Sequence, residues 1–237
     1  MSDTLLKVES LNAWYGRAQV LFDLGLEVGR GEVVALMGRN GAGKSTTMKA
    51  VMGLLEHKRG NLSFMGHDIA ALDPFRIARL GLGFVPENRR IFTDLSVVEN
   101  LEIGRQPPRE GIPEWTYERL FKLFPNLGEM PGRMGGSMSG GEQQMLTVSR
   151  TLMGNPYLVL LDEPSEGVAP VIVEQMAAMI MELKEKGVSI LLSEQNLHFA
   201  ELVSDRAYVL EKGQIRFQGS MEELAENQEV RKAYLEV

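Results

Sequence analysis

The sequence predicts an α/β fold in which a mainly parallel sheet carries an antiparallel β edge near the N-terminus and an inserted helical subdomain. Three observations predict it. Short, largely apolar runs such as VVALM and LVLL are typical of strands buried on both faces of a parallel sheet. Helical patterns alternate with these runs, as expected for α/β proteins. In the middle of the chain helical patterns replace strands altogether, which predicts a helical segment set into the sheet domain.

The expected elements follow from hydrophobic periodicity and from turn residues. In the first part of the chain, strands are expected at 5–11, 20–28, 31–37, 61–66 and 81–86, and a helix at 44–55. In the middle, helices are expected at 95–104, 115–124 and 139–154, with a Pro/Gly-rich surface loop at 106–113. In the last part, strands are expected at 158–162 and 188–193, a hairpin at 207–219, and helices at 171–187 and 221–237.

Length and composition narrow the classes of protein. The 237 residues predict one domain, 1–237, with a core formed by 1–92 and 158–237 and a helical subdomain at about 93–157. The net charge of -7 disfavours a nucleic-acid partner, because such proteins usually carry a basic patch. Cysteine is absent, which excludes disulfides and cysteine metal sites. The apolar runs are far shorter than the ~20 residues that a membrane span needs.

The stretch MGRNGAGKST, residues 37–46, follows one of the buried strands and opens a helix. Its pattern, Gly38-x4-Gly43-Lys44-Ser45, in this context predicts a phosphate-binding P-loop. Glycines let backbone N–H groups approach an anion, and Lys44 can reach the β- and γ-phosphates while the Ser45 hydroxyl ligates Mg²⁺. The simpler alternative is a glycine-rich turn. A dinucleotide site is disfavoured, since the glycine spacing is not G-x-G-x-x-G.

The remaining loop residues are expected to contact the phosphates through their backbone. They are Asn40, Gly41, Ala42 and Thr46, of which Thr46 is assigned to the α-phosphate.

The segment LVLLDEP supplies the carboxylates that a P-loop needs. Asp162 and Glu163 stand at the carboxyl end of a buried strand, where ligands bind in open α/β sheets. Asp162 is expected to hold Mg²⁺ through water, and Glu163 to polarise the attacking water as a general base. A solvated Asp-Glu turn is the alternative for this motif taken alone.

The segment SMSGGEQQM places Ser139, Gly140 and Gly141 before a helix, which is a second anion-binding geometry. A second phosphate site makes sense if this loop closes over the nucleotide of a neighbouring chain. Here the sequence resembles the ATP-binding subunits of ABC transporters. The resemblance covers nearly the whole chain, with the motifs in the family's order and spacing.

The resemblance implies roles for further residues. Tyr15 matches the aromatic residue that stacks on adenine, as a tyrosine face suits a purine. Glu163 matches the catalytic glutamate, with Lys44 also in the catalytic set. Gln195 stands where the family has its switch histidine and can still hydrogen-bond the γ-phosphate, without a positive charge. Glu87 stands where the family usually has glutamine in the loop that senses the γ-phosphate and contacts the membrane subunit, and is expected near Mg²⁺.

Smaller departures and shared segments point to one branch of the family. Met138, Glu142 and Ala169 replace the residues usual at their positions. The segments PENRRIF, SGGEQQM, EPSEGVAP and EQN together resemble the smaller ATPase of branched-chain amino acid importers. The same role for urea, amides or aromatic acids is the first alternative, and a soluble non-transport ABC ATPase is the second. A P-loop kinase is disfavoured because the 139–141 loop has no role there.

By resemblance, the chain hydrolyses ATP with Mg²⁺ to drive solute uptake through separate membrane permease subunits. Two P-loop chains are expected to sandwich two ATP molecules, as a heterodimer with a sister ATPase or as a homodimer. A solute-binding protein would act indirectly and select the solute together with the permeases. The chain itself would lie at the cytoplasmic face of the inner (plasma) membrane as a peripheral subunit.

Overall fold

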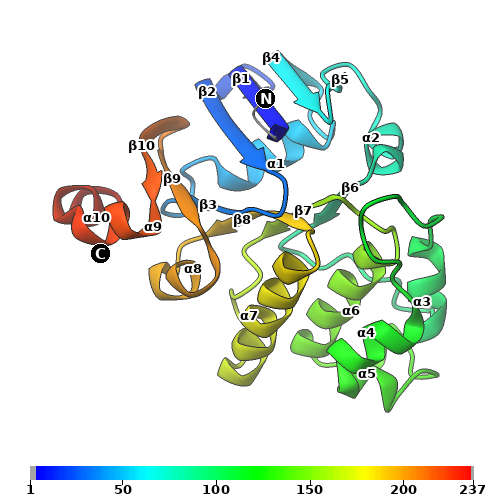
Figure 1. The fold of residues 1–237 in the computed structure, drawn as a ribbon. Coiled ribbons are helices and arrows are strands. Elements are labelled where there is room, and N and C mark those ends of the chain that lie inside the picture. The colour runs from blue at the N-terminus through cyan, green and yellow to red at the C-terminus, as the bar shows by residue number, and fades with distance from the viewer. Residues whose placement is uncertain (1–3, 236–237) are drawn as a thin grey trace.

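A computed structural model describes residues 4–235 and contains two sheets (Figure 1). The smaller sheet is antiparallel, with strand order β2-β1-β4-β5. Its strands are β1 (Thr4–Tyr15), β2 (Ala18–Gly29), β4 (His57–Phe64) and β5 (His67–Asp68). This sheet is the antiparallel edge that the sequence predicts, although the first strand runs to Tyr15 rather than ending at residue 11.

The larger sheet has the order β10-β9-β3-β8-β7-β6. All neighbouring pairs are parallel except β9 and β10, which form the predicted hairpin. The strands are β3 (Val33–Met37), β6 (Leu82–Val85), β7 (Leu158–Asp162), β8 (Ser189–Glu194), β9 (Arg206–Glu211) and β10 (Gln214–Ser220). Strands β3, β7 and β8 are buried along their whole length, as the apolar runs predict.

Helices cover both faces of the larger sheet. They are α1 (Lys44–Val51), α2 (Pro74–Leu80), α3 (Val97–Gly104), α4 (Tyr117–Leu123), α5 (Pro125–Gly128), a 3-10 turn η1 (Gly135–Ser137), α6 (Gly140–Leu152), α7 (Pro170–Glu185), α8 (Leu197–Val203), α9 (Met221–Glu226) and α10 (Gln228–Tyr234). Helix α1 packs between the two sheets, while α3, α6 and α7 pack on the opposite face. Alternate residues of β7 face the two cores: Leu160 faces α1, and Leu161 faces the helical side.

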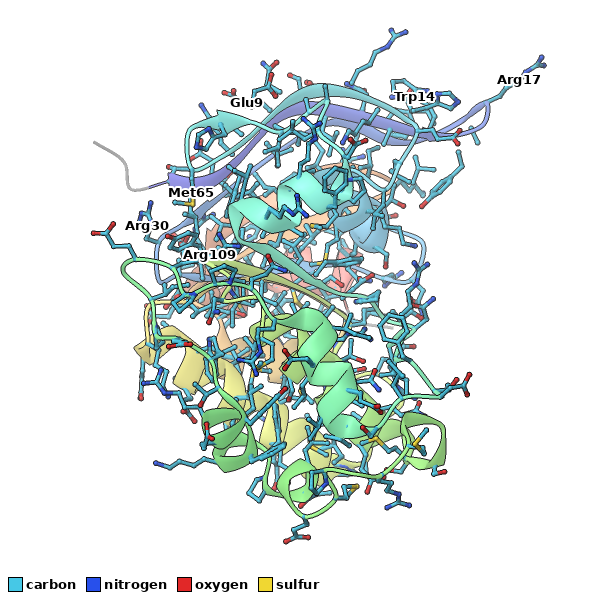
Figure 2. All side chains as sticks on the ribbon, turned by 90° about the vertical axis from the view of Figure 1, so that its right-hand side faces the viewer. Glu9, Trp14, Arg17, Arg30, Met65 and Arg109 are labelled. Carbon is cyan, nitrogen blue, oxygen red and sulfur yellow. The ribbon has the colours of Figure 1, made fainter. Side chains whose placement is uncertain are left out.

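The loop between α3 and α4 folds back onto the core. Arg109 donates from Nη1 to the carbonyl of Arg79 at 2.9 Å, and the Tyr157 hydroxyl donates to the carbonyl of Glu110 at 3.1 Å. Figure 2 shows Arg109 where the helical layer meets the sheets. The predicted surface loop at 106–113 therefore also fastens the helical insert to the core.

Two helix predictions were wrong in extent, and several short elements were missed. Helix α1 ends at Val51 rather than residue 55, because Gly53 adopts φ +72° and the Leu54 N–H bonds back to the carbonyl of Lys49 at 2.8 Å, a glycine-terminated helix end. The C-terminal stretch forms two helices, since the Asn227 side chain starts the second by accepting from the Val230 N–H at 3.1 Å. Its residues 236–237 lie outside the described residues. The short elements α2, β5, α5, η1 and α8 were not among the expected elements.

Candidate functional site

The phosphate loop, residues 38–43, joins β3 to α1, and only glycine fits at two of its positions. A Cβ on Gly38 would lie 2.4 Å from the carbonyl oxygen of Leu210. Gly43 has φ +115°, and a Cβ there would lie 2.8 Å from Leu21 Cδ2. Gly43 also begins α1 without a side-chain cap, so the first N–H groups of the helix remain available to an anion.

Lys44 is almost completely buried at the start of α1, with 3% of its surface exposed. Its Nζ donates to the carbonyls of Gly38 at 2.7 Å and Arg39 at 3.2 Å. The same atom forms an ion pair with Glu163 Oε1 at 2.9 Å. The sequence motifs at 38–45 and 162–163, far apart in the chain, thus meet directly at this lysine.

Ser45 and Asp162 form the second link between the loop and β7. The Ser45 hydroxyl donates to Asp162 Oδ1 at 2.9 Å, and the Ser193 hydroxyl donates to the same oxygen at 2.7 Å. Burial raises the pKa of Asp162 above its ordinary value, against the effect of these two hydrogen bonds. A hydroxyl beside a carboxylate is an oxygen donor set that suits Mg²⁺.

Within residues 4–235, no three acidic or histidine side chains converge as a metal cage. An ion at Ser45 and Asp162 would therefore complete its shell with phosphate oxygens and water, which is usual for Mg²⁺ in nucleotide sites. Glu87 is exposed and, with Ser45, lines a cavity described below. Its predicted place near the ion stays a prediction.

Glu163 is held in a constrained position after β7. Its backbone has φ +49°, an uncommon value for a residue with a side chain. Its N–H donates to the carbonyl of Ser193 at 3.1 Å, and its Oε2 accepts from Gln195 Nε2 at 3.0 Å. Burial works against its ionised form, but hydrogen bonds from Glu166, Lys44 and Gln195 outweigh burial and lower the pKa of Glu163.

Glu166 is a residue that the sequence reasoning missed. Its hydrogen bond to Glu163, together with partial burial and the negative charges of Glu163 and Glu87, raises the pKa of Glu166 to about 7. With a pKa near neutrality, Glu166 is expected to be partly protonated at pH 7 and, in that form, to donate to the Glu163 carboxylate. Glu166 was visible in the segment EPSEGVAP, but nothing in the spacing showed that it folds back onto Glu163.

Most of the predicted phosphate-binding residues, though not Gly38, line a cavity of about 260 Å³. Its lining comprises Val20, Asn40, Gly41, Gly43, Lys44, Ser45, Thr46, Glu87 and Glu163. Ala42 does not line it: this residue is buried and ties the loop to the β9–β10 turn by accepting from the Gly213 N–H at 2.8 Å.

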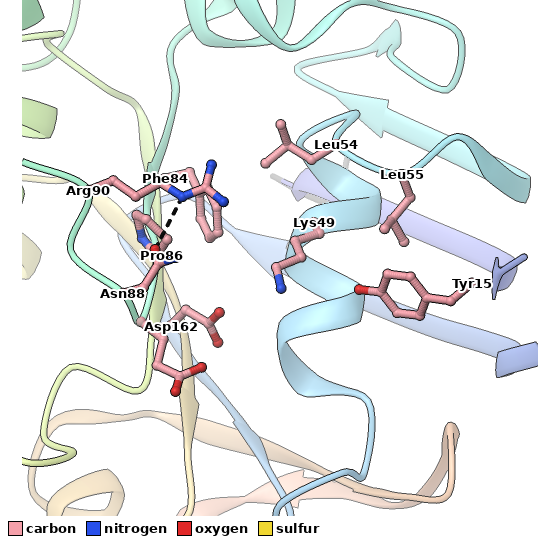
Figure 3. A pocket seen from close by; sticks show the side chains of 10 residues that line it. Tyr15, Lys49, Leu54, Leu55, Phe84, Pro86, Asn88, Arg90 and Asp162 are labelled. Atoms are coloured by element: carbon pink, nitrogen blue, oxygen red, sulfur yellow. Dashed lines mark hydrogen bonds between the residues drawn. The ribbon is translucent and has the colours of Figure 1, made fainter.

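A neighbouring cavity of about 350 Å³, which shares Glu87 with the first, lies between α1 and residues 84–90 (Figure 3). It is lined by Tyr15, Lys49, Leu54, Leu55, Phe84, Pro86, Glu87, Asn88, Arg90 and Asp162. Tyr15 is 49% exposed at the end of β1 and lies near Lys49 in this view. Tyr15 lines this cavity rather than the phosphate cavity, so its adenine role stays a prediction.

The second glycine motif forms the N-terminus of α6. The Ser139 hydroxyl accepts from the Glu142 N–H at 3.4 Å, and Glu142 Oε2 accepts from the Ser139 N–H at 2.6 Å. Both glycines are closely packed against side chains: a Cβ on Gly140 would lie 2.8 Å from the Arg89 guanidinium, and one on Gly141 would lie 2.7 Å from Ile172. These three residues line neither cavity, so the chain does not bring them to its own phosphate loop.

The fold and this arrangement define a P-loop nucleotide hydrolase. Comparison with known proteins assigns the family: the model of the ABC transporter family matches residues 21–166. The chain is 41% identical over 231 residues to the high-affinity branched-chain amino acid transport ATP-binding protein BraG of Pseudomonas aeruginosa, covering 98% of this chain and 99% of that protein. The chain belongs to the ABC transporter family as an ATP-binding subunit.

Two further relatives show how broad the likeness is. The lipopolysaccharide export system ATP-binding protein LptB of Haemophilus influenzae is 32% identical over 234 residues, covering 98% of this chain and 97% of that protein. The crystal structure of the ADP conformation of MJ1267, an ATP-binding cassette of an ABC transporter, has a TM-score of 0.80 at 28% identity and covers 97% of both chains. The predicted family, fold and ATPase activity are confirmed.

The family also fixes the general mode of action. Its ATP-binding domains bind and hydrolyse ATP and act as dimers with membrane permease subunits. No helix among residues 4–235 has the length and apolar character needed to cross a bilayer.

Proposed function

We propose that this chain hydrolyses MgATP at the phosphate cavity to drive the uptake of branched-chain amino acids through separate membrane permeases. The observation that carries the catalytic part is the contact of Glu163 with both Lys44 and Gln195 at the edge of that cavity. The likeness to BraG over nearly the full length of both chains supports the solute.

The residues at the phosphate cavity have different proposed roles in hydrolysis. Ser45 and Asp162 would hold Mg²⁺, which neutralises charge on the β- and γ-phosphates when bound. Lys44 exchanges Glu163 for phosphate oxygens and stabilises the charge that develops on them. Glu163, released from Lys44, accepts the proton of the attacking water. The Gln195 amide donates to Glu163 and orients its carboxylate towards that water.

The loop at Ser139, Gly140 and Gly141 is assigned to the nucleotide of a partner chain, since it stands apart from its own chain's cavities. Tyr15 is assigned to adenine. The partner is a sister ATPase or a second copy of this chain, and the pair works at the cytoplasmic face of the plasma membrane. The exposed loop that carries Glu87 and Arg90 is the proposed contact with the permease.

The main competing function is export of a lipid such as lipopolysaccharide, because LptB is also similar over nearly its full length. Uptake of urea, amides or aromatic acids and a soluble, non-transport role remain the other candidates. All of these share the ATPase chemistry and differ in the membrane partners.

The experiment that tests the proposal uses Glu163→Gln in cells that lack the native gene. Wild-type protein should restore uptake of labelled leucine, isoleucine and valine, and the variant should not, with ATP hydrolysis lowered by more than about a hundredfold. Affinity purification from mildly solubilised membranes should recover two permeases and a second ATPase. Normal leucine uptake without the gene, together with failed lipopolysaccharide export, would overturn the solute assignment. Hydrolysis that persists in the variant would overturn the catalytic one.

A further inference from the structure

Glu194 is a buried carboxylate that the proposed mechanism does not use. It is the last residue of β8 and directly precedes Gln195, with 2% of its surface exposed. It lines neither of the two cavities described above. Burying a carboxylate is costly unless hydrogen bonds satisfy it, and burial raises the pKa of Glu194.

The two oxygens of Glu194 bind two different segments of the site. Oε1 accepts from the backbone N–H of Ser165 at 3.2 Å, in the turn that follows Glu163. Oε2 accepts from the N–H of Gln195 at 3.1 Å and from that of Asn196 at 3.2 Å, at the start of α8. Glu194 is therefore a brace between the turn at 163–165 and the turn at 195–196.

The brace closes a ring of contacts around the proposed general base. Glu163 donates its N–H to the carbonyl of Ser193, and Gln195 donates its amide to the Glu163 carboxylate at 3.0 Å. Asn196 is also fixed, because its side chain accepts from the Phe199 N–H at 3.1 Å and caps α8. Gln195 thus lies between two anchored points, which limits where its side chain can reach.

A simple cap would not need a carboxylate. One hydroxyl or amide oxygen can satisfy the N–H groups of one turn. Only a side chain with two acceptor oxygens and no donor can hold both turns at once, and the ionised carboxylate is that group. The choice of glutamate at this buried position is explained by the joining of the two turns.

We propose that Glu194 is a positioning residue for ATP hydrolysis, holding the Gln195 amide against the Glu163 carboxylate by bracing the two turns that carry them. The proposal rests on the roles assigned to Glu163 and Gln195 above. It adds a residue that never touches nucleotide and acts on the rate through Gln195.

The test substitutes Glu194→Gln in the assembled transporter and separates kcat from KM for MgATP. The amide has one acceptor oxygen, so it satisfies one turn and presents its NH2 to the donors of the other. We expect kcat to fall about tenfold with KM changed less than about twofold, since displaced catalytic groups cost rate more than binding. Glu223→Gln is the matched control: that carboxylate accepts a backbone N–H at the start of α9, and its loss should leave kcat unchanged.

A double-mutant cycle shows whether Glu194 acts through Gln195. With Gln195→Ala already present, Glu194→Gln should lower kcat by less than about twofold further, because the amide it positions is gone. Full additivity, an unchanged kcat in Glu194→Gln, or a rise in KM at constant kcat would each overturn the proposal.

If Glu194→Gln does not fold, Glu194→Asp, which keeps both oxygens on a shorter side chain, is judged by the same criteria. Glu163→Gln measured in parallel distinguishes the two failures: activity there overturns the proposed function, whereas an inactive Glu163→Gln beside a fully active Glu194→Gln overturns only the brace.

Discussion

Lys44 and Glu163 form an almost fully buried ion pair that joins the phosphate loop to the end of β7, with Nζ and Oε1 2.9 Å apart. The lysine begins the helix that would receive phosphate, and the glutamate is the proposed base for water. Each group is therefore neutralised by the other. In the proposed mechanism, phosphate oxygens take the lysine and release the glutamate, which would link nucleotide binding to the freeing of the base.

The first prediction concerns the stability of this pair. Lys44→Met leaves Glu163 buried without its cation and should lower the free energy of unfolding by about 3 kcal/mol. Adding Glu163→Gln should recover much of the loss, because a neutral side chain no longer needs the lysine. Urea unfolding of the four proteins of the cycle without nucleotide measures the coupling.

An exposed pair provides the control for that cycle. Arg76 and Asp73 form an exposed ion pair at the start of α2, and Arg76→Met should change the free energy of unfolding by less than about 0.5 kcal/mol. Equal losses in Lys44→Met and Arg76→Met would show that the buried pair contributes nothing particular to the fold.

The second prediction separates metal binding from folding at Asp162. Because burial raises the pKa of this carboxyl, its contribution to stability is present at low pH and is lost as pH rises through the raised pKa. At neutral pH Asp162→Asn should therefore keep the free energy of unfolding within about 1 kcal/mol of wild type or increase it. ATP affinity should lose its dependence on Mg²⁺, measured by calorimetry with magnesium and with EDTA.

Asp73→Asn, on an exposed carboxylate before α2, is the control for this substitution. It should leave the magnesium dependence intact. If Asp162→Asn binds ATP as tightly as wild type in EDTA, and gains as much affinity from magnesium as wild type does, the ion is held elsewhere.

Local patterns predicted the parts of the site that lie within one segment. The strand before Gly38, the helix after Lys44 and the carboxylates at the end of β7 follow from apolar runs, glycine spacing and strand ends. The contacts between segments could not be predicted, because they depend on how β7 and β8 align. Glu166 folding onto Glu163 and Glu194 joining two turns are of this kind.

The limits of local patterns also explain the errors in the predicted helices. Apolar residues continue past Val51, so periodicity alone extends α1, whereas the left-handed Gly53 ends it. Helix α2, with one fully buried residue, Ile77, has too weak an apolar face to be recognised. The confirmed features are the layered α/β fold and the family, whereas the roles of individual site residues stay predictions.

The third prediction is a pH dependence centred on Glu166. Its folded pKa of about 7 lies above its ordinary value of 4.5, chiefly because of the hydrogen bond to Glu163. A raised folded pKa means that the stabilising contribution is complete below the unfolded pKa and is lost as pH rises towards 7. Wild type should therefore lose more stability than Glu166→Gln between about pH 5 and pH 8. Urea midpoints at several pH values measure this, and parallel curves for the two proteins would contradict the raised pKa of Glu166.

The fourth prediction tests how closely the phosphate loop packs on β9. In Gly38→Ala the new Cβ would meet the Leu210 carbonyl at 2.4 Å, and backbone cannot move aside as a flexible side chain can. We expect a loss of about 1–3 kcal/mol in the free energy of unfolding. ATP affinity should fall as well, because the Gly38 carbonyl holds Lys44 Nζ. Gly132→Ala, where nothing lies within 4 Å, should change stability by less than about 0.5 kcal/mol. A Gly38→Ala protein as stable as Gly132→Ala would mean that the loop is free to shift, and the fixed geometry at Lys44 would then need another cause.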